Sequence, residues 1–266
     1  MDTDPEFAIR PLIREHTGPV AEIRRTAHGN SSDLTAIVEC EKGPFFIKAV
    51  RDRPGGPRDS LIREREVDAA LVHIAPPLLW DVEEDGWLVL GYEVVDGRSA
   101  DFAPGSPDLP LVVDTVAQIG RVPLPAFARD WKEARWDRFA ASSEEAELFR
   151  GDSLLHTDIN PDNFLVGGHR AWAVDWAWPT VGAGFIDSAL LVVQLIAAGH
   201  TPASAEKWAT QLPAWHKAAP GAINAFAAAN LRMYRAAAAR KPDEDWLKAM
   251  VEACRAWADH RGVPAE

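Results

Sequence analysis

The sequence predicts an α+β protein with a small strand-rich N-terminal part and a larger helical C-terminal part. Short runs of β-branched and aromatic residues recur through roughly the first third of the chain. A Pro-rich stretch at 104–110 follows Gly97, and Ala- and Leu-rich runs with a period near four come after it. The 266 residues are enough for one large domain or for two lobes. We expect an N-terminal domain at 1–95 and a C-terminal domain at 96–266.

The predicted strands are short apolar runs separated by turn residues. They are expected at 21–28, 34–39, 45–50, 78–82 and 87–91. A helix is expected between the third and fourth strands. Ser60 is a suitable N-cap for it, and Pro76-Pro77 ends it after about Ile74.

The helical part is predicted from the spacing of its apolar residues. Helices are expected at 111–120, 129–149, 185–198, 203–215, 222–239 and 244–261. Between the second and third of them, short apolar runs, Leu154-Leu155 and 164–166, flank a polar loop and predict a strand–loop–strand segment.

That polar loop carries the most informative motif of the chain. It has the spacing His-x-Asp-x-x-x-x-Asn, from His156 through Asp158 to Asn163, and Asp175 follows twelve residues later after an apolar run. This is the layout of a kinase catalytic loop followed by a metal-binding Asp. Asp158 is therefore predicted to accept a proton from a substrate hydroxyl. Asn163 and Asp175 are predicted to hold Mg²⁺, a hard cation that prefers oxygen ligands.

Two further residues are expected to shape the loop. His156 is predicted to act by packing and hydrogen bonding rather than by catalysis. Asp187 begins a strongly apolar helix, where a negative charge is favoured by the helix dipole. It is also a candidate for bonding the backbone amides of the loop, and the two interpretations are compatible.

Lys48 is the candidate phosphate-binding cation, because an ammonium in the middle of an apolar strand is costly without a partner. In kinases this position contacts nucleotide phosphates and pairs with a helix Glu. Glu64 shares a helical stripe with Val67 and Leu71 and is the preferred partner. Glu66, on a weaker stripe, stays open as the alternative.

The segment between the first two strands contains Gly29, Asn30, Ser31 and Ser32. Its backbone N–H groups are candidates for covering nucleotide phosphates, as a glycine-rich loop does. An ordinary hairpin turn would have the same composition, so both interpretations remain.

Composition excludes several classes of function. Lys and Arg number 28 against 40 Asp and Glu, and a net charge of −12 argues against a nucleic-acid partner. Cys40 and Cys254 fit no metal or redox spacing. The longest apolar run, 189–199, is shorter than the roughly 20 residues that span a bilayer. We expect a cytoplasmic protein with no membrane partner, as a monomer or weak dimer.

Together these residues resemble the aminoglycoside phosphotransferase family, within the protein-kinase-like fold. The resemblance extends over about 29–191 and is strongest at 156–163, 174–176 and 182–190. It implies a bilobal fold, ATP or GTP as co-substrate, and Mg²⁺. It also implies that Lys48 and Glu64 form the ion pair on the nucleotide side, and that backbone groups around Tyr92 and Val94 bind the purine.

The function expected from this resemblance is transfer of the γ-phosphate to a hydroxyl of a small molecule. The acceptor would be an antibiotic such as an aminoglycoside, in a resistance role, or a related metabolite. Ala177 replaces the Gly that protein kinases have two residues after the metal-binding Asp, which disfavours a protein substrate. Few clustered carboxylates occur in 203–261, where the family builds its acceptor pocket, so a less basic acceptor is also open. The alternatives are a catalytically inactive kinase-like binding protein and a metal-dependent hydrolase.

Overall fold

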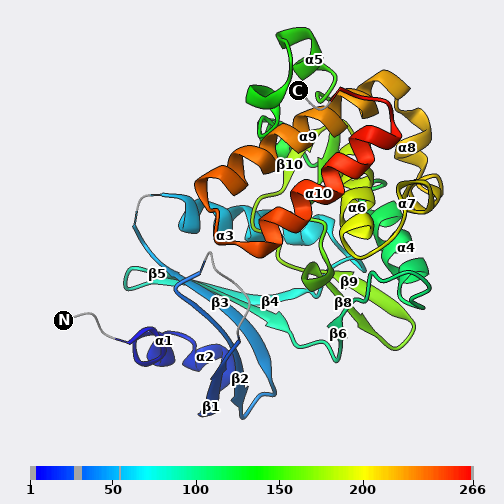
Figure 1. The fold of residues 1–266 in the computed structure, drawn as a ribbon. Helices are drawn as coiled ribbons and strands as arrows, with labels where there is room; N and C mark the ends of the chain where they lie inside the picture. The colour runs from blue at the N-terminus through cyan, green and yellow to red at the C-terminus, as the bar shows by residue number, and fades with distance from the viewer. Residues whose placement is uncertain (1–3, 27–31, 54, 265–266) are drawn as a thin grey trace. The chain divides into compact units, whose positions relative to one another are not determined.

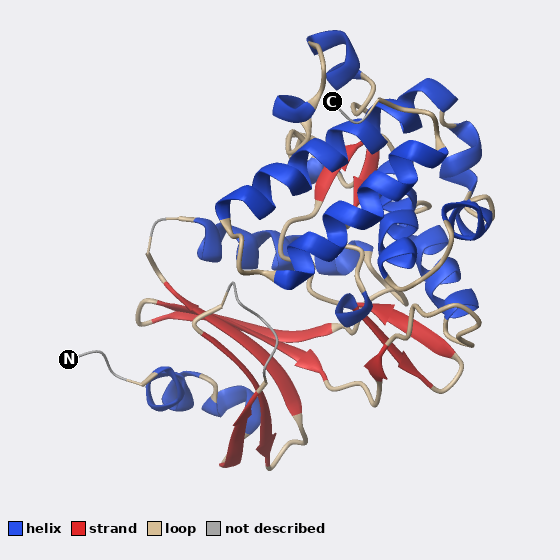
Figure 2. Ribbon diagram, in the orientation of Figure 1, coloured by secondary structure: helices blue, strands red, loops and turns tan. Residues whose placement is uncertain are grey.

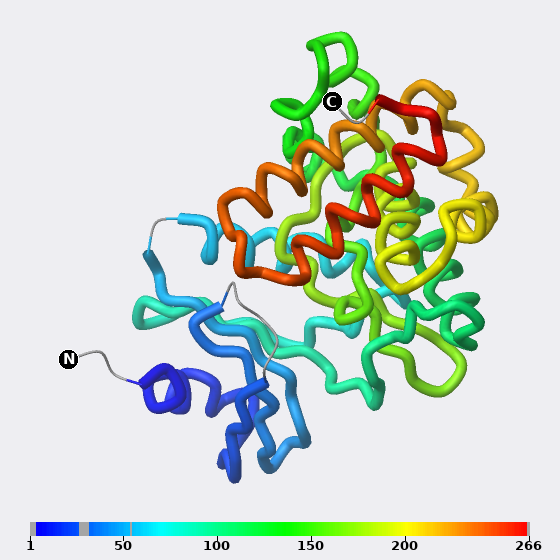
Figure 3. The backbone as a smooth tube through the Cα atoms, in the orientation of Figure 1, coloured from blue at the N-terminus to red at the C-terminus, as the bar shows by residue number. Residues whose placement is uncertain are grey.

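The computed structural model describes residues 4–26, 32–53 and 55–264. The chain divides into two compact units. The first comprises Met1–Gly97 and the short return segment Trp172–Trp178, and the second comprises Arg98–Ala171 and Pro179–Glu266. Figure 3 traces the chain through both. The return segment is the part of this division that the sequence analysis did not anticipate.

The first unit is built on a five-stranded antiparallel sheet of order β1-β2-β3-β5-β4 (Figure 2). Its strands are β1 (Val20–Arg25), β2 (Leu34–Cys40), β3 (Phe45–Arg51), β4 (Leu78–Glu84) and β5 (Trp87–Glu93). Its helices are α1 (Pro5–Leu12), α2 (Arg14–Thr17), α3 (Gly56–Val67) and the 3₁₀ turn η1 (Asp68–Ala70). The sequence analysis did not anticipate α1 and α2.

Opposite faces of this sheet are covered by different helices (Figure 1). Ile9 of α1 and Ile13, between α1 and α2, pack with Ile47 and Ala49 of β3 on one face. Leu61 of α3 packs against the other face. Because side chains alternate along a strand, Lys48 points to the α3 face.

The predicted start of α3 was wrong. The helix begins at Gly56 with Pro57 in its first turn, and Gly55 at φ 127° is its N-cap. Ser60, the predicted cap, is buried inside the helix. α3 ends at Val67 and η1 follows, so the last predicted turns are not α-helical.

The second unit is mostly helical. Its helices are α4 (Leu109–Ile119), α5 (Ser143–Glu147), α6 (Phe185–Ala197), α7 (Pro202–Ala209), α8 (Pro213–Lys217), α9 (Pro220–Arg240) and α10 (Asp245–His260), with 3₁₀ turns η2 (Ala126–Ala128), η3 (Asp137–Phe139) and η4 (Pro161–Asn163). α6 is apolar on nearly all sides because α7, α8, α9 and α10 all contact it. The last two helices run side by side (Figure 1).

Short strands, most of them wholly within the second unit, frame the predicted loop. They are β6 (Arg98–Ser99), β7 (Ser153–Leu155), β8 (Phe164–Gly167), β9 (Arg170–Ala173) and β10 (Thr180–Gly182). β7 and β8 flank residues 156–163, as the strand–loop–strand prediction requires. β7 pairs with β10, and a second sheet has the order β6-β8-β9.

Two predicted helices were wrong. The region 129–149 contains turns, η3 and the five-residue α5 instead of one long helix. The amide of Glu133 donates to the carbonyl of Val181, 2.8 Å away, so this backbone is used in a long-range contact. The predicted helix 203–215 is divided into α7 and α8, and Pro213 starts the second of them.

None of the helices in the described ranges is both long and apolar enough to cross a membrane.

Candidate active site

Lys48 lies in a cluster of three charges within the first unit. Its Nζ is 2.8 and 3.0 Å from the two carboxylate oxygens of Glu64, and 2.7 Å from Oδ1 of Asp175. The side chains of Lys48 and Glu64 are 6% and 8% exposed, whereas that of Asp175 is 31% exposed. Glu66, the alternative partner, is exposed. The structure therefore brings together Lys48, Glu64 and Asp175, three of the predicted site residues.

Burial and the neighbouring charges have opposite effects on the pKa values of Lys48 and Glu64. Burial disfavours the ammonium of Lys48, but the carboxylates of Glu64 and Asp175 outweigh it and raise the pKa of Lys48. Burial raises the pKa of Glu64, against the effect of the Lys48 charge. Burial, followed by the charge of Glu64, raises the pKa of Tyr92 well above its usual range. Tyr92 therefore stays protonated beside the pair.

Local contacts within the first unit hold Asp175 in place. Its φ is 60°, an uncommon conformation for a residue other than Gly. On one side, the amide of Ala173 donates to the carbonyl of Ile74, 2.8 Å away. On the other, Nε1 of the buried Trp176 donates to the carbonyl of Ala173, 3.1 Å away. The first bond ties the segment to Ile74, and the second closes the turn around Asp175.

The predicted purine-binding residues lie at the end of β5. Tyr92 is buried within the strand, and its backbone is paired with β3 and β4. Val94 follows the strand and is half-buried. In the part of the chain that the structure describes, the N–H and C=O of Val94 form no backbone hydrogen bond. Of the two, Val94 is therefore the residue whose backbone groups are not used in the sheet.

The predicted phosphate-covering segment lies mostly outside the described residues. Gly29, Asn30 and Ser31 belong to the omitted range 27–31, and Ser32 is a half-buried bend residue. Directly after it, the carboxylate of Asp33 accepts from the backbone amide of Arg51 at 2.8 Å. The role of these four residues stays a prediction.

Asp158 is exposed in the loop between β7 and β8, and hydrogen bonds orient its carboxylate. Nδ2 of Asn163 donates to its Oδ2 and to its backbone carbonyl, each at 2.9 Å. Nδ2 of Asn160 donates to its Oδ1 at 3.1 Å. The amide of Asp158 donates to Nδ1 of His156 at 3.2 Å. His156 therefore shapes the loop, as predicted.

Asn163 combines an oriented donor with an unused acceptor. Because its Nδ2 bonds two oxygens of Asp158, its Oδ1 must point elsewhere. That oxygen has no hydrogen-bond partner among the described residues, and Asn163 is buried. An amide oxygen held in this way suits Mg²⁺.

Asp187 and Arg135 fix the backbone ahead of Asp158. The two carboxylate oxygens of Asp187 each accept one amide, from His156 and from Thr157, at 2.9 Å. This confirms the predicted contact with the loop. Arg135 donates to the carbonyl and hydroxyl of Thr157, at 3.0 and 3.1 Å. Thr157 has a φ of 62°, and these bonds stabilise that strained conformation.

Replacing Asp187 with Asn is expected to lower both stability and turnover. Asn keeps one acceptor oxygen but presents an NH₂ group to the second amide. We expect the free energy of unfolding to fall by about 1–3 kcal/mol because a buried amide loses its acceptor. We expect kcat to fall by up to about 10²-fold because the loop shifts. Urea melts and steady-state kinetics test this, with the exposed Asp152→Asn as control. Wild-type kcat in folded Asp187→Asn would contradict the role.

A depression of about 340 Å³ adjoins Asp158 within the second unit. Its apolar wall includes Ile159, Leu190, Val193, Met233 and Met250. Its polar lining comes from Asp158, Arg135, Thr157, Gln194 and Tyr234. Sequence reasoning missed Arg135, Gln194 and Tyr234 as site residues. Arg135 lay in a wrongly predicted helix, and the other two are isolated residues of long helices with no motif around them.

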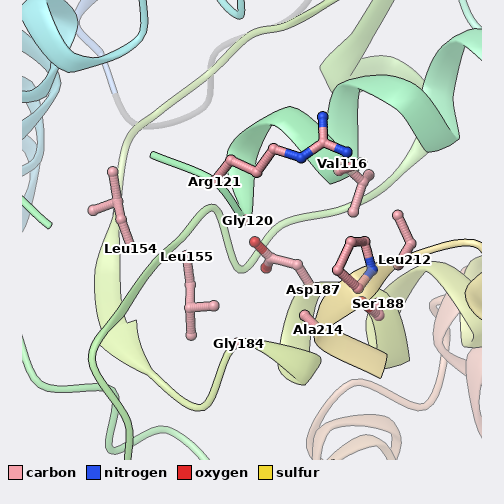
Figure 4. A pocket seen from close by; sticks show the side chains of 12 residues that line it. Val116, Gly120, Arg121, Leu154, Leu155, Gly184, Asp187, Ser188, Leu212 and Ala214 are labelled. Atoms are coloured by element: carbon pink, nitrogen blue, oxygen red, sulfur yellow. The ribbon is translucent and has the colours of Figure 1, made fainter. Parts of the chain in front are cut away.

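A second depression, of about 360 Å³, is lined by residues that do not include Asp158. Leu154, Leu155 and Leu212 line it, with Arg121 and Asp187 also in its wall (Figure 4). Both carboxylate oxygens of Asp187 already bond loop amides. This carboxylate is therefore already used within the loop.

Comparisons with known proteins identify the fold. No family model matches the chain, and no curated protein matches it in sequence. Solved structures do match. An aminoglycoside phosphotransferase from Alicyclobacillus acidocaldarius has a TM-score of 0.65 at 16% identity, covering 95% of each chain. Choline kinase LicA from Streptococcus pneumoniae has a TM-score of 0.64 at 13% identity, covering 96% of this chain and 99% of its own.

A third match is a spectinomycin phosphotransferase in complex with ADP and spectinomycin. It has a TM-score of 0.61 at 11% identity and covers 95% of this chain and 93% of its own. The chain therefore has the kinase-like α+β fold that aminoglycoside phosphotransferases and choline kinases share. The predicted fold class is confirmed, as is the resemblance at the level of the fold.

Proposed function

We propose that this chain is a small-molecule O-phosphotransferase of the aminoglycoside phosphotransferase and choline kinase type, using ATP or GTP. The observation that carries the proposal is the loop at Asp158. Asn163 and Asn160 orient its carboxylate, and Asp187 holds the preceding amides. This arrangement occurs in a fold whose solved relatives include several small-molecule kinases.

In the proposed reaction, Asp158 accepts the proton of the acceptor hydroxyl. The hydroxyl oxygen forms a bond to the γ-phosphorus, and the bond from that phosphorus to the bridging oxygen of the nucleotide breaks. The nucleoside diphosphate leaves with the bonding electrons. Such reactions depend mainly on positioning and on charge neutralisation. The hydrogen bonds from Asn160 and Asn163 place the base before the substrate arrives.

Lys48 and Val94 are proposed to bind the nucleotide. The ammonium of Lys48, oriented by Glu64, would contact the phosphates, and the free backbone groups of Val94 would bond the purine. The solved spectinomycin phosphotransferase contains ADP, which supports a nucleotide co-substrate here.

The donor set fits Mg²⁺ as the metal. Asn163 Oδ1 and the carboxylate of Asp175 would hold it, and Mg²⁺ would neutralise charge on the phosphates. Within the described ranges, no group of three or more His, Cys, Asp and Glu side chains could hold a metal ion. Mg²⁺ commonly takes one or two protein ligands and completes its shell with phosphate oxygens and water. The two proposed ligands suit that mode.

The first test is thermal stabilisation by nucleotide. Mg²⁺–ATP or Mg²⁺–GTP at 100 times its Kd should stabilise the protein by roughly 2.7 kcal/mol. Asp175→Asn should lose the part of that shift that depends on Mg²⁺. Absence of any nucleotide shift in well-folded protein would count against the proposal. Nucleotide binding without phosphate transfer to any alcohol would favour the inactive binding protein instead.

A further inference from the structure

The charge balance of the depression beside Asp158 bears on which acceptor can enter it. Among the described residues that line it, Asp158 is the one carboxylate and Arg135 the one cation. Asp158 is reserved for the hydroxyl proton in the proposed function, on which this inference rests. The lining therefore offers a cationic acceptor no second carboxylate, and Arg135 repels it.

Trp136, one of the two aromatic residues of the lining, is not open to a cationic ligand. A quaternary ammonium is commonly bound on the face of a Trp or Tyr ring. Here the guanidinium carbon of Arg135 lies 5.0 Å from the ring centre of Trp136, so a cation already covers that ring. Phe226 packs against the same Trp136, 4.8 Å between ring centres. Arg135 is in turn bonded to Thr157, so displacing it would disturb the catalytic loop.

Two neutral polar groups are available in the lining instead. The amide of Gln194 and the hydroxyl of Tyr234 have no hydrogen-bond partner among the described residues. Burial, mainly, raises the pKa of Tyr234, so its hydroxyl stays protonated and donates. Met233, Met250, Leu190 and Val193 surround them with apolar surface. An apolar wall with a few neutral polar groups suits an uncharged ligand with an apolar body.

We infer that the acceptor is an uncharged, hydroxyl-bearing compound with an apolar body, oriented by Gln194 and Tyr234. Its hydroxyl meets Asp158, and its apolar part contacts the Met, Leu and Val side chains of α6, α9 and α10. Polycationic aminoglycosides and choline are the compounds that this lining disfavours. Gln194 is then a specificity-determining residue, because its neutral amide adds no second carboxylate to the lining.

The test uses two alcohols of the same shape that differ in charge. Choline carries a quaternary ammonium, and 3,3-dimethylbutan-1-ol has a carbon atom in place of the nitrogen. Phosphorylation of each is measured with Mg²⁺–ATP, together with the binding of each by calorimetry. For the wild type, kcat/KM should be about tenfold or more higher for the neutral alcohol, because choline meets Arg135 without a compensating carboxylate.

Gln194→Glu is the deciding variant, because it adds a carboxylate with little change of shape. It should reverse the preference by raising kcat/KM for choline and lowering it for the neutral alcohol. Gln211→Glu, an exposed position outside the depression, is the matched control and should keep the wild-type preference. Tyr234→Phe should keep both the wild-type preference and nucleotide binding, because the single hydroxyl of each alcohol meets Asp158 and the change adds no charge.

Three results would overturn the inference. They are a wild-type preference for choline, an unchanged preference in Gln194→Glu, and binding of neither alcohol by protein that binds nucleotide. None of these affects the proposed nucleotide chemistry. Failure of the proposed function is a separate result, namely no stabilisation by Mg²⁺–ATP or Mg²⁺–GTP.

Discussion

Replacing Asp158 with Asn is expected to lower kcat by about 10²–10⁴-fold, the usual contribution of a positioned general base. Asn has nearly the same shape, and its amide oxygen can still accept from Nδ2 of Asn163, which lies 2.9 Å from Asp158 Oδ2. It cannot take the proton of the acceptor hydroxyl at neutral pH. The Kd for nucleotide should therefore stay within a few-fold of wild type while turnover is lost.

The control for this prediction lies in the same loop. Asp162 is exposed and makes no side-chain hydrogen bond among the described residues, so Asp162→Asn should retain most of the wild-type kcat. The measurements are the steady-state kcat with an alcohol that the wild type phosphorylates, and the nucleotide Kd by calorimetry. Near-wild-type turnover in pure Asp158→Asn would contradict both the assigned base and the proposed reaction.

Replacing Lys48 with Met is expected to lower the free energy of unfolding, the second large effect. This change leaves the buried carboxylate of Glu64 and the half-buried one of Asp175 without their cation. Removing one partner of a buried ion pair costs about 3–5 kcal/mol. The double variant Lys48→Met with Glu64→Leu removes the stranded charge, so it should be more stable than Lys48→Met alone. Urea melts of the two single variants, the double variant and wild type give the coupling energy.

The pH dependence of these variants has a definite sign. In wild type, the pKa of Lys48 is raised by folding. The charge of Lys48 therefore stabilises the folded protein fully below pH 10.5, and this stabilisation is lost as the pH rises through the raised pKa. In Lys48→Met, Glu64 can bind a proton instead. The loss of unfolding free energy relative to wild type, here called the deficit, should therefore shrink toward pH 4.5, the ordinary pKa of Glu. It should grow as the pH rises above that value. A deficit that does not change between pH 5 and pH 9 would contradict the role of Glu64.

Much of the candidate site follows from local sequence. The spacing from His156 to Asn163 predicts the loop, because one uninterrupted loop positions its own residues. The polarity of Lys48 within an apolar strand predicts a buried partner, because an unpaired buried charge is too costly. The helical stripe with Val67 and Leu71 favours Glu64 over Glu66, because residues three and four apart share one face of a helix.

The tertiary structure decided the features that depend on distant residues. Arg135 bonds Thr157, and Gln194 and Tyr234 line the depression beside Asp158, although α6 and α9 follow the loop at different distances along the chain. The region 129–149 is rich in helix-forming residues, but its contact with Val181 replaces the helix. Local propensity is weaker than such long-range contacts. The sequence by itself therefore determined which residues are proposed as base, metal ligands and cation, each marked by local spacing or polarity. Only the fold decided which neutral side chains surround the base, because they come together through packing of helices far apart in the chain.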